Sequence, residues 1–193
     1  MKKVFYIHIN ENDETGMDAI SLVDYPAVKR NFLCFEEDKK PVMVKMSDEA
    51  QKIITGVVCL ADTPIYRYDK ELGEYYVVFT KEVIKQMMEK YGKQGLWNSV
   101  NLQHDDDKFV NSCVMIESYL KDSERGINPS EFSDIPDGSW LMSFKVEDED
   151  LWNDIINGDK LNGFSLQGIF NYSLSKDAFE DESDFDNWIK KYL

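Results

Sequence analysis

Two side chains in this sequence have the chemistry of a nucleophile and its base. Ser165 lies in the run LNGFSLQG at residues 161–168, where strand alternation places it on the face opposite its apolar neighbours. A serine hydroxyl is a weak nucleophile until a base removes its proton, and histidine is the usual base. The chain has two histidines, of which His8 lies inside an apolar run whereas His104 follows one. We therefore predict that His104 is the base for Ser165.

The groups around this pair are less well defined by the sequence. A catalytic imidazole needs a third group to orient it, and three carboxylates are open for this role: Glu117, which we select, Asp18 and Asp24. Backbone amides near Gly168 are expected to hold the oxyanion, since glycines allow the close approach of another backbone. The structural alternative is a surface histidine in a charged turn and a glycine-bracketed bend in an ordinary strand.

Composition and charge exclude several other classes of function. The chain has 193 residues, 42% of them hydrophobic, which is enough for one domain with a real core. Its formal net charge is −15, so no overall positive field attracts nucleic acid or anionic lipid. No apolar run approaches the roughly 20 residues that span a bilayer, and the opening segment lacks a signal-peptide core. We predict a soluble intracellular protein with neither nucleic acid nor a membrane as partner.

Metal and cofactor chemistry is not indicated either. Two histidines are too few for a multi-histidine metal site, and the three cysteines, Cys34, Cys59 and Cys113, form no CxxC pair. We expect the cysteines to be buried free thiols. No metal site and no cofactor is predicted.

Runs of β-formers separated by polar breaks predict a sheet-rich fold. The expected strands cover residues 4–9, 19–23, 31–35, 42–46, 53–60, 74–79, 99–103, 109–120, 140–146 and 161–172. Two helices are expected, one capped by Thr80 and running through Tyr91 and one over residues 149–157. The polar segment 121–139 is expected to be an exposed, mobile loop, with substrate flap as one interpretation. The fold class is α+β and β-dominated, with a few helices around a sheet or small barrel.

Seven pieces of the sequence together resemble the XkdF-type serine proteases of tailed phages, relatives of the prohead maturation proteases. They occur in order along the chain. The pieces are ISLVDYPA at 20–27, ITGVV at 54–58, TPIYR at 63–67, VNLQHD at 100–105, IESY at 116–119, GSW at 138–140 and LNGFSLQG at 161–168.

The resemblance implies a herpesvirus-assemblin-like β-barrel in which serine is the nucleophile and histidine the base. Carried onto this chain, these roles fall on Ser165 and His104. The third member in assemblin-type enzymes is another histidine. The only spare one here is His8, so an acidic residue or an effective dyad is expected. Residues 1–175 would form the protease domain, and residues 176–193 an acidic C-terminal tail or short helix.

The resemblance also implies a biological role. The expected protein is a serine endopeptidase that cleaves scaffold and major capsid precursor proteins, and itself, inside the assembling prohead in the host cytoplasm. A prophage could also encode it. A homodimer is expected by analogy with assemblin. The alternative, from another class of function, is a scaffold or capsid-associated module that keeps the protease fold without the activity.

The sequence departs from the family pattern at two places. Where the pattern GFSxEG has glutamate, this chain has Gln167, so a carboxylate role at that position is lost. The SLVxxPA strand precedes the histidine here, whereas in other prohead proteases it follows the serine. This order indicates a circular permutation of the barrel, which would place the strand at 19–23 beside the Ser165 strand and bring Asp18 or Asp24 near the site.

Overall fold

The computed structural model describes residues 3–27, 33–34, 51–70, 73–156 and 161–174. Strands dominate this part of the chain, which confirms the β-dominated α+β class. The elements are β1 (Lys3–His8), β2 (Gly16–Val23), β3 (Leu33–Cys34), β4 (Ile53–Cys59), β5 (Ile65–Asp69), β6 (Gly73–Val78), α1 (Lys81–Lys93), β7 (Val100–Leu102), β8 (Asp105–Phe109), β9 (Cys113–Leu120), a 3-10 turn (Ser130–Phe132), β10 (Trp140–Val146), α2 (Glu149–Ile156), β11 (Gly163–Ile169) and β12 (Asn171–Leu174).

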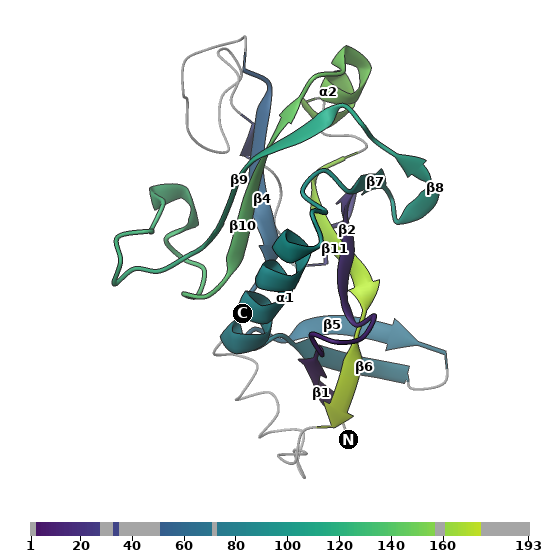
Figure 1. Cartoon of the computed structure of the whole chain (residues 1–193), viewed down its shortest axis with the longest axis vertical. Coiled ribbons are helices and arrows are strands. Elements are labelled where there is room, and N and C mark those ends of the chain that lie inside the picture. Colours follow the sequence, from purple (N-terminus) through teal and green to yellow (C-terminus); the bar gives the residue numbers. More distant parts are fainter. Residues whose placement is uncertain (1–2, 28–32, 35–50, 71–72, 157–160, 175–193) are drawn as a thin grey trace.

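Hydrogen bonds group these strands into three sheets of four. Their orders are β12-β1-β6-β5, β3-β4-β10-β9 and β11-β2-β7-β8. In Figure 1, β4, β9 and β10 lie together on one side, β2, β7, β8 and β11 on the other, and β1, β5 and β6 at the lower end. The described strands form no closed barrel, so the assemblin-like barrel stays a prediction.

Helix α1 forms where the sequence predicts it and packs against β2. The Thr80 side chain accepts a hydrogen bond from the Val83 amide and caps the first turn. The apolar face of the helix is buried, with Ile84, Met87 and Tyr91 fully enclosed. The tyrosine ring stacks edge-on against Trp140 of β10, with ring centroids 5.8 Å apart. The helix is therefore part of the common core.

The sheet that carries the candidate nucleophile aligns three polar residues in a row. Antiparallel pairing of β11 with β2 sets Ser165 opposite Ser21, and parallel pairing of β2 with β7 sets Ser21 opposite Asn101. Both Ser21 and Asn101 are fully buried. The predicted neighbourhood of the strand at 19–23 and the Ser165 strand is thus confirmed.

A two-residue turn joins β7 to β8 and carries the candidate base. Leu102 pairs with Asp105, and the two residues between them, Gln103 and His104, have φ of 55° and 58°. Two consecutive left-handed residues define the type I′ hairpin turn, for which Asn-Gly is the preferred pair. Neither residue here is glycine or asparagine, so the turn holds backbone strain of about 1 kcal/mol per residue.

Several local predictions need correction. The strand expected over 161–172 is divided into β11 and β12, which belong to different sheets. The strand expected over 109–120 is divided, because β8 ends at Phe109 and β9 begins at Cys113. Segment 121–139 is anchored rather than free: Phe132 and Ile135 are buried, and the buried Lys121 ammonium donates to the Ile135 carbonyl. These contacts fix parts of the segment, whereas residues 123–126 are exposed as expected, and the flap interpretation stays a prediction. The strand expected at 42–46 and the tail at 176–193 lie outside the described residues.

Gly168 is required where β11 crosses close to β2. A Cβ at this position would lie 2.0 Å from the carbonyl oxygen of Gly16 and 2.8 Å from the Met17 Cα. Because backbone atoms have no freedom to move aside, Gly168→Ala is expected to lower the free energy of unfolding by about 3 kcal/mol, measured by urea denaturation. Gly95→Ala is the matched control, since that site is open and strained only by its φ of 71°. A loss no larger than the roughly 1 kcal/mol expected for the control would contradict the prediction.

Candidate active site

The structure brings Ser165 and His104 together. Ser165 Oγ lies 3.0 Å from His104 Nε2, although the two residues are 61 positions apart in the chain. The serine is on β11 and 8% exposed, whereas the imidazole reaches it from the exposed tip of the β7–β8 turn. Both residues also line a cavity, so a molecule bound there can reach the hydroxyl. These are the two residues that the sequence singled out.

A chain of hydrogen bonds runs from Asp106 through Gln167 and Asn101 to Ser21, which lies beside the other nitrogen of the imidazole. The Asp106 carboxylate can only accept hydrogen bonds, so the Gln167 amide group must turn its Nε2 toward it. Gln167 Nε2 donates to Asp106 Oδ1 at 2.6 Å. Gln167 Oε1 then accepts from Asn101 Nδ2 at 2.8 Å. This arrangement leaves Asn101 Oδ1 facing Ser21 Oγ at 2.5 Å. Each amide orientation follows from the one before it.

The same chain determines which imidazole nitrogen carries the proton. Asn101 Oδ1 cannot donate, so the single hydroxyl proton of Ser21 goes to it. Ser21 Oγ must therefore accept from His104 Nδ1, which lies 2.9 Å away. With Nδ1 protonated, the Nε2 lone pair is free to accept the Ser165 proton. This tautomer is the one that a serine nucleophile requires.

The carboxylates predicted as the third member do not contact the imidazole. Glu117 lies on β9, in a different sheet, and its Oε2 accepts from Ser143 Oγ at 2.6 Å. Asp18 lies near Asp106 and is largely exposed. Partial removal of its carboxyl from water, together with the neighbouring charge of Asp106, raises the pKa of that carboxyl. Asp24 Oδ1 accepts from the next backbone amide. The group at Nδ1 is the neutral hydroxyl of Ser21, which the prediction did not consider.

His8 does not supply a second histidine. Its Nε2 lies 2.6 Å from Ser173 Oγ at the exposed pairing of β1 with β12.

The described residues contain no group of three or more His, Cys, Asp or Glu side chains arranged to hold a metal ion. None of the helices in that part of the chain has the length and apolar character needed to cross a membrane.

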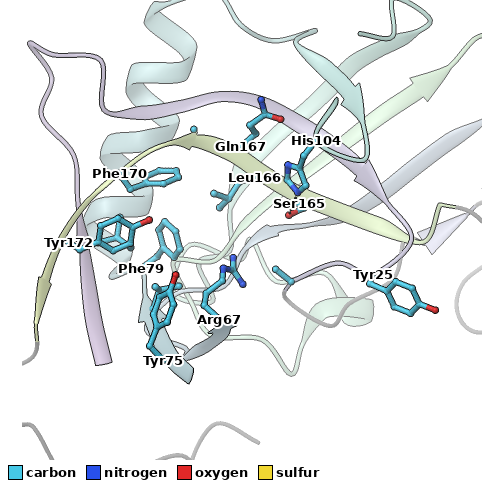
Figure 2. A pocket seen from close by; sticks show the side chains of 14 residues that line it. Tyr25, Arg67, Tyr75, Phe79, His104, Ser165, Leu166, Gln167, Phe170 and Tyr172 are labelled. Carbon is cyan, nitrogen blue, oxygen red and sulfur yellow. Dashed lines mark hydrogen bonds between the residues drawn. The ribbon is translucent and has the colours of Figure 1, made fainter. Parts of the chain in front are cut away.

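A cavity of about 420 Å³ opens beside the Ser165–His104 pair, as Figure 2 shows. The pair and residues 166–168 of β11 line one side, and residues of β5, β6 and β12 line the other. Aromatic rings form much of the wall. The rings of Phe79 and Phe170 pack edge to face, with their centroids 5.6 Å apart. The cavity also contains the side chain of Arg67.

Two features of this site escaped the sequence analysis. Ser21 was missed because the search for a third member considered only carboxylates. Its signal was a hydroxyl inside the apolar run Ile20–Leu22, because a buried polar group requires a partner. Arg67 was missed because β5 was not predicted, so the side of that strand on which it lies was unknown.

At this site a serine hydroxyl forms a hydrogen bond with an imidazole, and the other imidazole nitrogen is held by a second hydrogen bond. Serine hydrolases have this arrangement beside a substrate cavity. Comparison with known protein families narrows the class. A family model described as "Putative phage serine protease XkdF" matches residues 40–173, and the chain belongs to this family. No curated protein and no solved structure matches the chain.

Proposed function

We propose that the protein is a serine endopeptidase in which Ser165 is the nucleophile and His104 the general base. The observation that carries the proposal is the 3.0 Å contact between Ser165 Oγ and a His104 Nε2 that the hydrogen-bond chain leaves free to accept. The family membership supports the same reaction class. The cavity beside the pair supports the proposal, because it offers a concave space in which part of a substrate can bind next to the hydroxyl.

The proposed reaction follows from the positions of these groups. Ser165 Oγ attacks the scissile carbonyl carbon while His104 Nε2 takes its proton, and the Nδ1 proton stays on the hydrogen bond to Ser21. His104 then returns the proton to the leaving amine, and water hydrolyses the acyl-enzyme by the same route. Backbone amides near Gly168 are proposed to hold the oxyanion. The break in the β11–β2 ladder between Gln167 and Gly168 supports this, because such a break leaves backbone groups unpaired.

The proposed substrates are the scaffold and major capsid precursor proteins of the phage that encodes this chain. They would be cleaved inside the assembling prohead, by a homodimeric enzyme that also cleaves itself. This part of the proposal rests on the family and on its resemblance to prohead maturation proteases.

The test is a processing assay with the wild-type protein and Ser165→Ala. Each is incubated with the cognate scaffold and capsid precursors, and all fragments are identified by intact mass. We expect defined fragments with the wild type and none with Ser165→Ala at equal concentration and equal thermal stability. We expect no fragments from Ser165→Ala because alanine has no atom that can form the acyl-enzyme.

Two outcomes would redirect the assignment. Intact precursors with both proteins, together with incorporation of the folded chain into capsid-related assemblies, would favour the non-enzymatic module. Identical fragments from both proteins would place the nucleophile elsewhere or reveal a contaminating protease.

A further inference from the structure

Among the described residues that line the cavity beside the Ser165–His104 pair, Arg67 carries a permanent positive charge. Arg67 lies on β5 directly opposite Tyr75 of β6. Its two strand neighbours, Tyr66 and Tyr68, are exposed, whereas Arg67 is half-buried on the inward face. Figure 2 shows its guanidinium pointing into the cavity, on the side toward Ser165. The charge therefore faces the space where a substrate would lie.

Few neighbouring groups stabilise the positive charge of Arg67 at this position. Arg67 Nη1 donates a hydrogen bond to the Tyr66 carbonyl oxygen at 3.0 Å. Within the described part of the chain, no carboxylate forms an ion pair with the guanidinium. Burial lowers the pKa of the guanidinium, because removal from water disfavours the charged form. A partly desolvated cation without a counter-ion is stabilised by any anion that enters the cavity.

The chemistry of the wall fits a carboxylate. Arginine presents parallel N–H donors that match the two oxygens of a carboxylate, and the hydroxyls of Tyr75 and Tyr172 line the same cavity as further donors. The aromatic rings accommodate the methylene groups of an acidic side chain. Since the whole chain has a net charge of −15, acidic peptides are otherwise repelled, and a local cation is required to bind one.

We propose that this cavity is a specificity pocket that binds an acidic side chain, glutamate or aspartate, next to the scissile bond of the substrate. Arg67 pairs with the carboxylate. This inference rests on the proposed peptidase function, because it uses the nearness of the cavity to Ser165 and His104. It names the substrate class of the site, which the Ser165–His104 geometry alone leaves open.

The first experiment compares matched peptides. Cleavage sites are located by mass spectrometry in a peptide library with amidated C-termini, so that only side chains supply carboxylates. The best substrate is then made with Glu or Gln at the selected position. We expect wild-type kcat/KM to favour Glu at least 10-fold, and Arg67→Gln to reduce the ratio to about 1. Arg67→Lys should retain part of the preference, and Arg67→Glu should favour a basic residue at the same position.

Arg125→Gln is the matched control. It removes the same charge from an exposed arginine that pairs with Asp122, and it should keep the wild-type Glu preference. A wild-type enzyme without an acidic preference, or a preference that survives in Arg67→Gln, would overturn the proposal. Self-association of Arg67→Gln with unchanged specificity would instead assign Arg67 to protecting the edge of β5, where an inward charge discourages strand pairing.

A binding experiment separates this proposal from the peptidase function. N-acetyl-glutamate methylamide and its glutamine analogue are titrated into Ser165→Ala and followed by NMR chemical shifts. We expect saturable shifts with the glutamate compound alone, abolished by the additional change Arg67→Gln and retained with Arg125→Gln. This result would support the acidic pocket even if no peptide were cleaved. Equal shifts from both compounds, or shifts that persist without Arg67, would overturn the pocket even in an active peptidase.

Discussion

Ser165→Ala and His104→Ala are each expected to reduce kcat/KM for peptide cleavage by about 10⁴-fold or more, and the double variant to lose no more than either one alone. The reason is that the hydroxyl and the imidazole act as one unit. Without His104 Nε2 at 3.0 Å, the Ser165 proton has no acceptor, and without the hydroxyl the base has nothing to activate. The measurement is steady-state cleavage of a fluorogenic peptide containing the identified site.

Reaction with a fluorophosphonate gives a second readout of the same unit. The probe transfers its phosphonyl group to an activated serine with loss of fluoride, so the wild type should gain one adduct on Ser165. His104→Ala should react far more slowly, and Ser165→Ala should not react. Losses that multiply in the double variant, or an adduct on another serine, would contradict a shared Ser165–His104 mechanism.

Ser21→Ala is expected to lower kcat by about 100-fold while changing KM little. Ser21 touches no substrate in the proposed reaction and is a positioning residue. Its removal takes away the acceptor for His104 Nδ1–H, so the ring loses both its orientation and the preference for the reactive tautomer. The effect should be smaller than that of the charged third member in other serine proteases, because a hydroxyl is neutral. The split between kcat and KM checks this role.

Two variants serve as controls for the Ser21 prediction. Ser21→Thr keeps the hydroxyl and should recover part of the rate. Glu117→Gln should leave kcat within about 2-fold of wild type, because Glu117 bonds to Ser143 and not to the imidazole. If Glu117→Gln lost as much activity as Ser21→Ala, Glu117 would be the third member after all. The thermal stability of Ser21→Ala must be measured alongside its activity. The change leaves the buried Asn101 Oδ1 without a hydrogen-bond donor, which lowers the free energy of unfolding by about 1–3 kcal/mol.

The Ser165–His104 pair could be predicted from the sequence because the chain offers so few choices. With two histidines in 193 residues, eliminating the one inside an apolar run leaves a single base. The neighbourhood of the 19–23 strand and the Ser165 strand was also predicted, from the order of the family-like pieces. Residue type and order along the chain are enough for such inferences.

The rest of the site depends on register and turn geometry, which residue types do not determine. Ser21 meets the imidazole only because β11, β2 and β7 align with Ser165, Ser21 and Asn101 in one row. The β7–β8 turn carried no recognisable signal, since Gln103 is not a residue that favours a left-handed turn. Segment 121–139 looked free because its composition is polar, yet Phe132 and Ile135 hold it in the core.

Gln167 illustrates how a departure from the family pattern is accommodated. Loss of the glutamate in GFSxEG removes a carboxylate from β11. The amide of Gln167 instead donates to Asp106 at 2.6 Å, so a negative charge still ends the hydrogen-bond chain from the next hairpin. The carboxylate at the end of this hydrogen-bond chain is therefore on β8 and not on β11.

The strained turn at Gln103 and His104 has an evolutionary consequence. A hairpin free to optimise its own stability would replace this pair by Asn-Gly, which takes up the left-handed backbone without strain. The proposed role of the imidazole as the base opposes that change at position 104. In related chains, a histidine retained at position 104 would therefore mark selection for the proposed chemistry, and Asn-Gly at positions 103 and 104 would mark selection for stability alone.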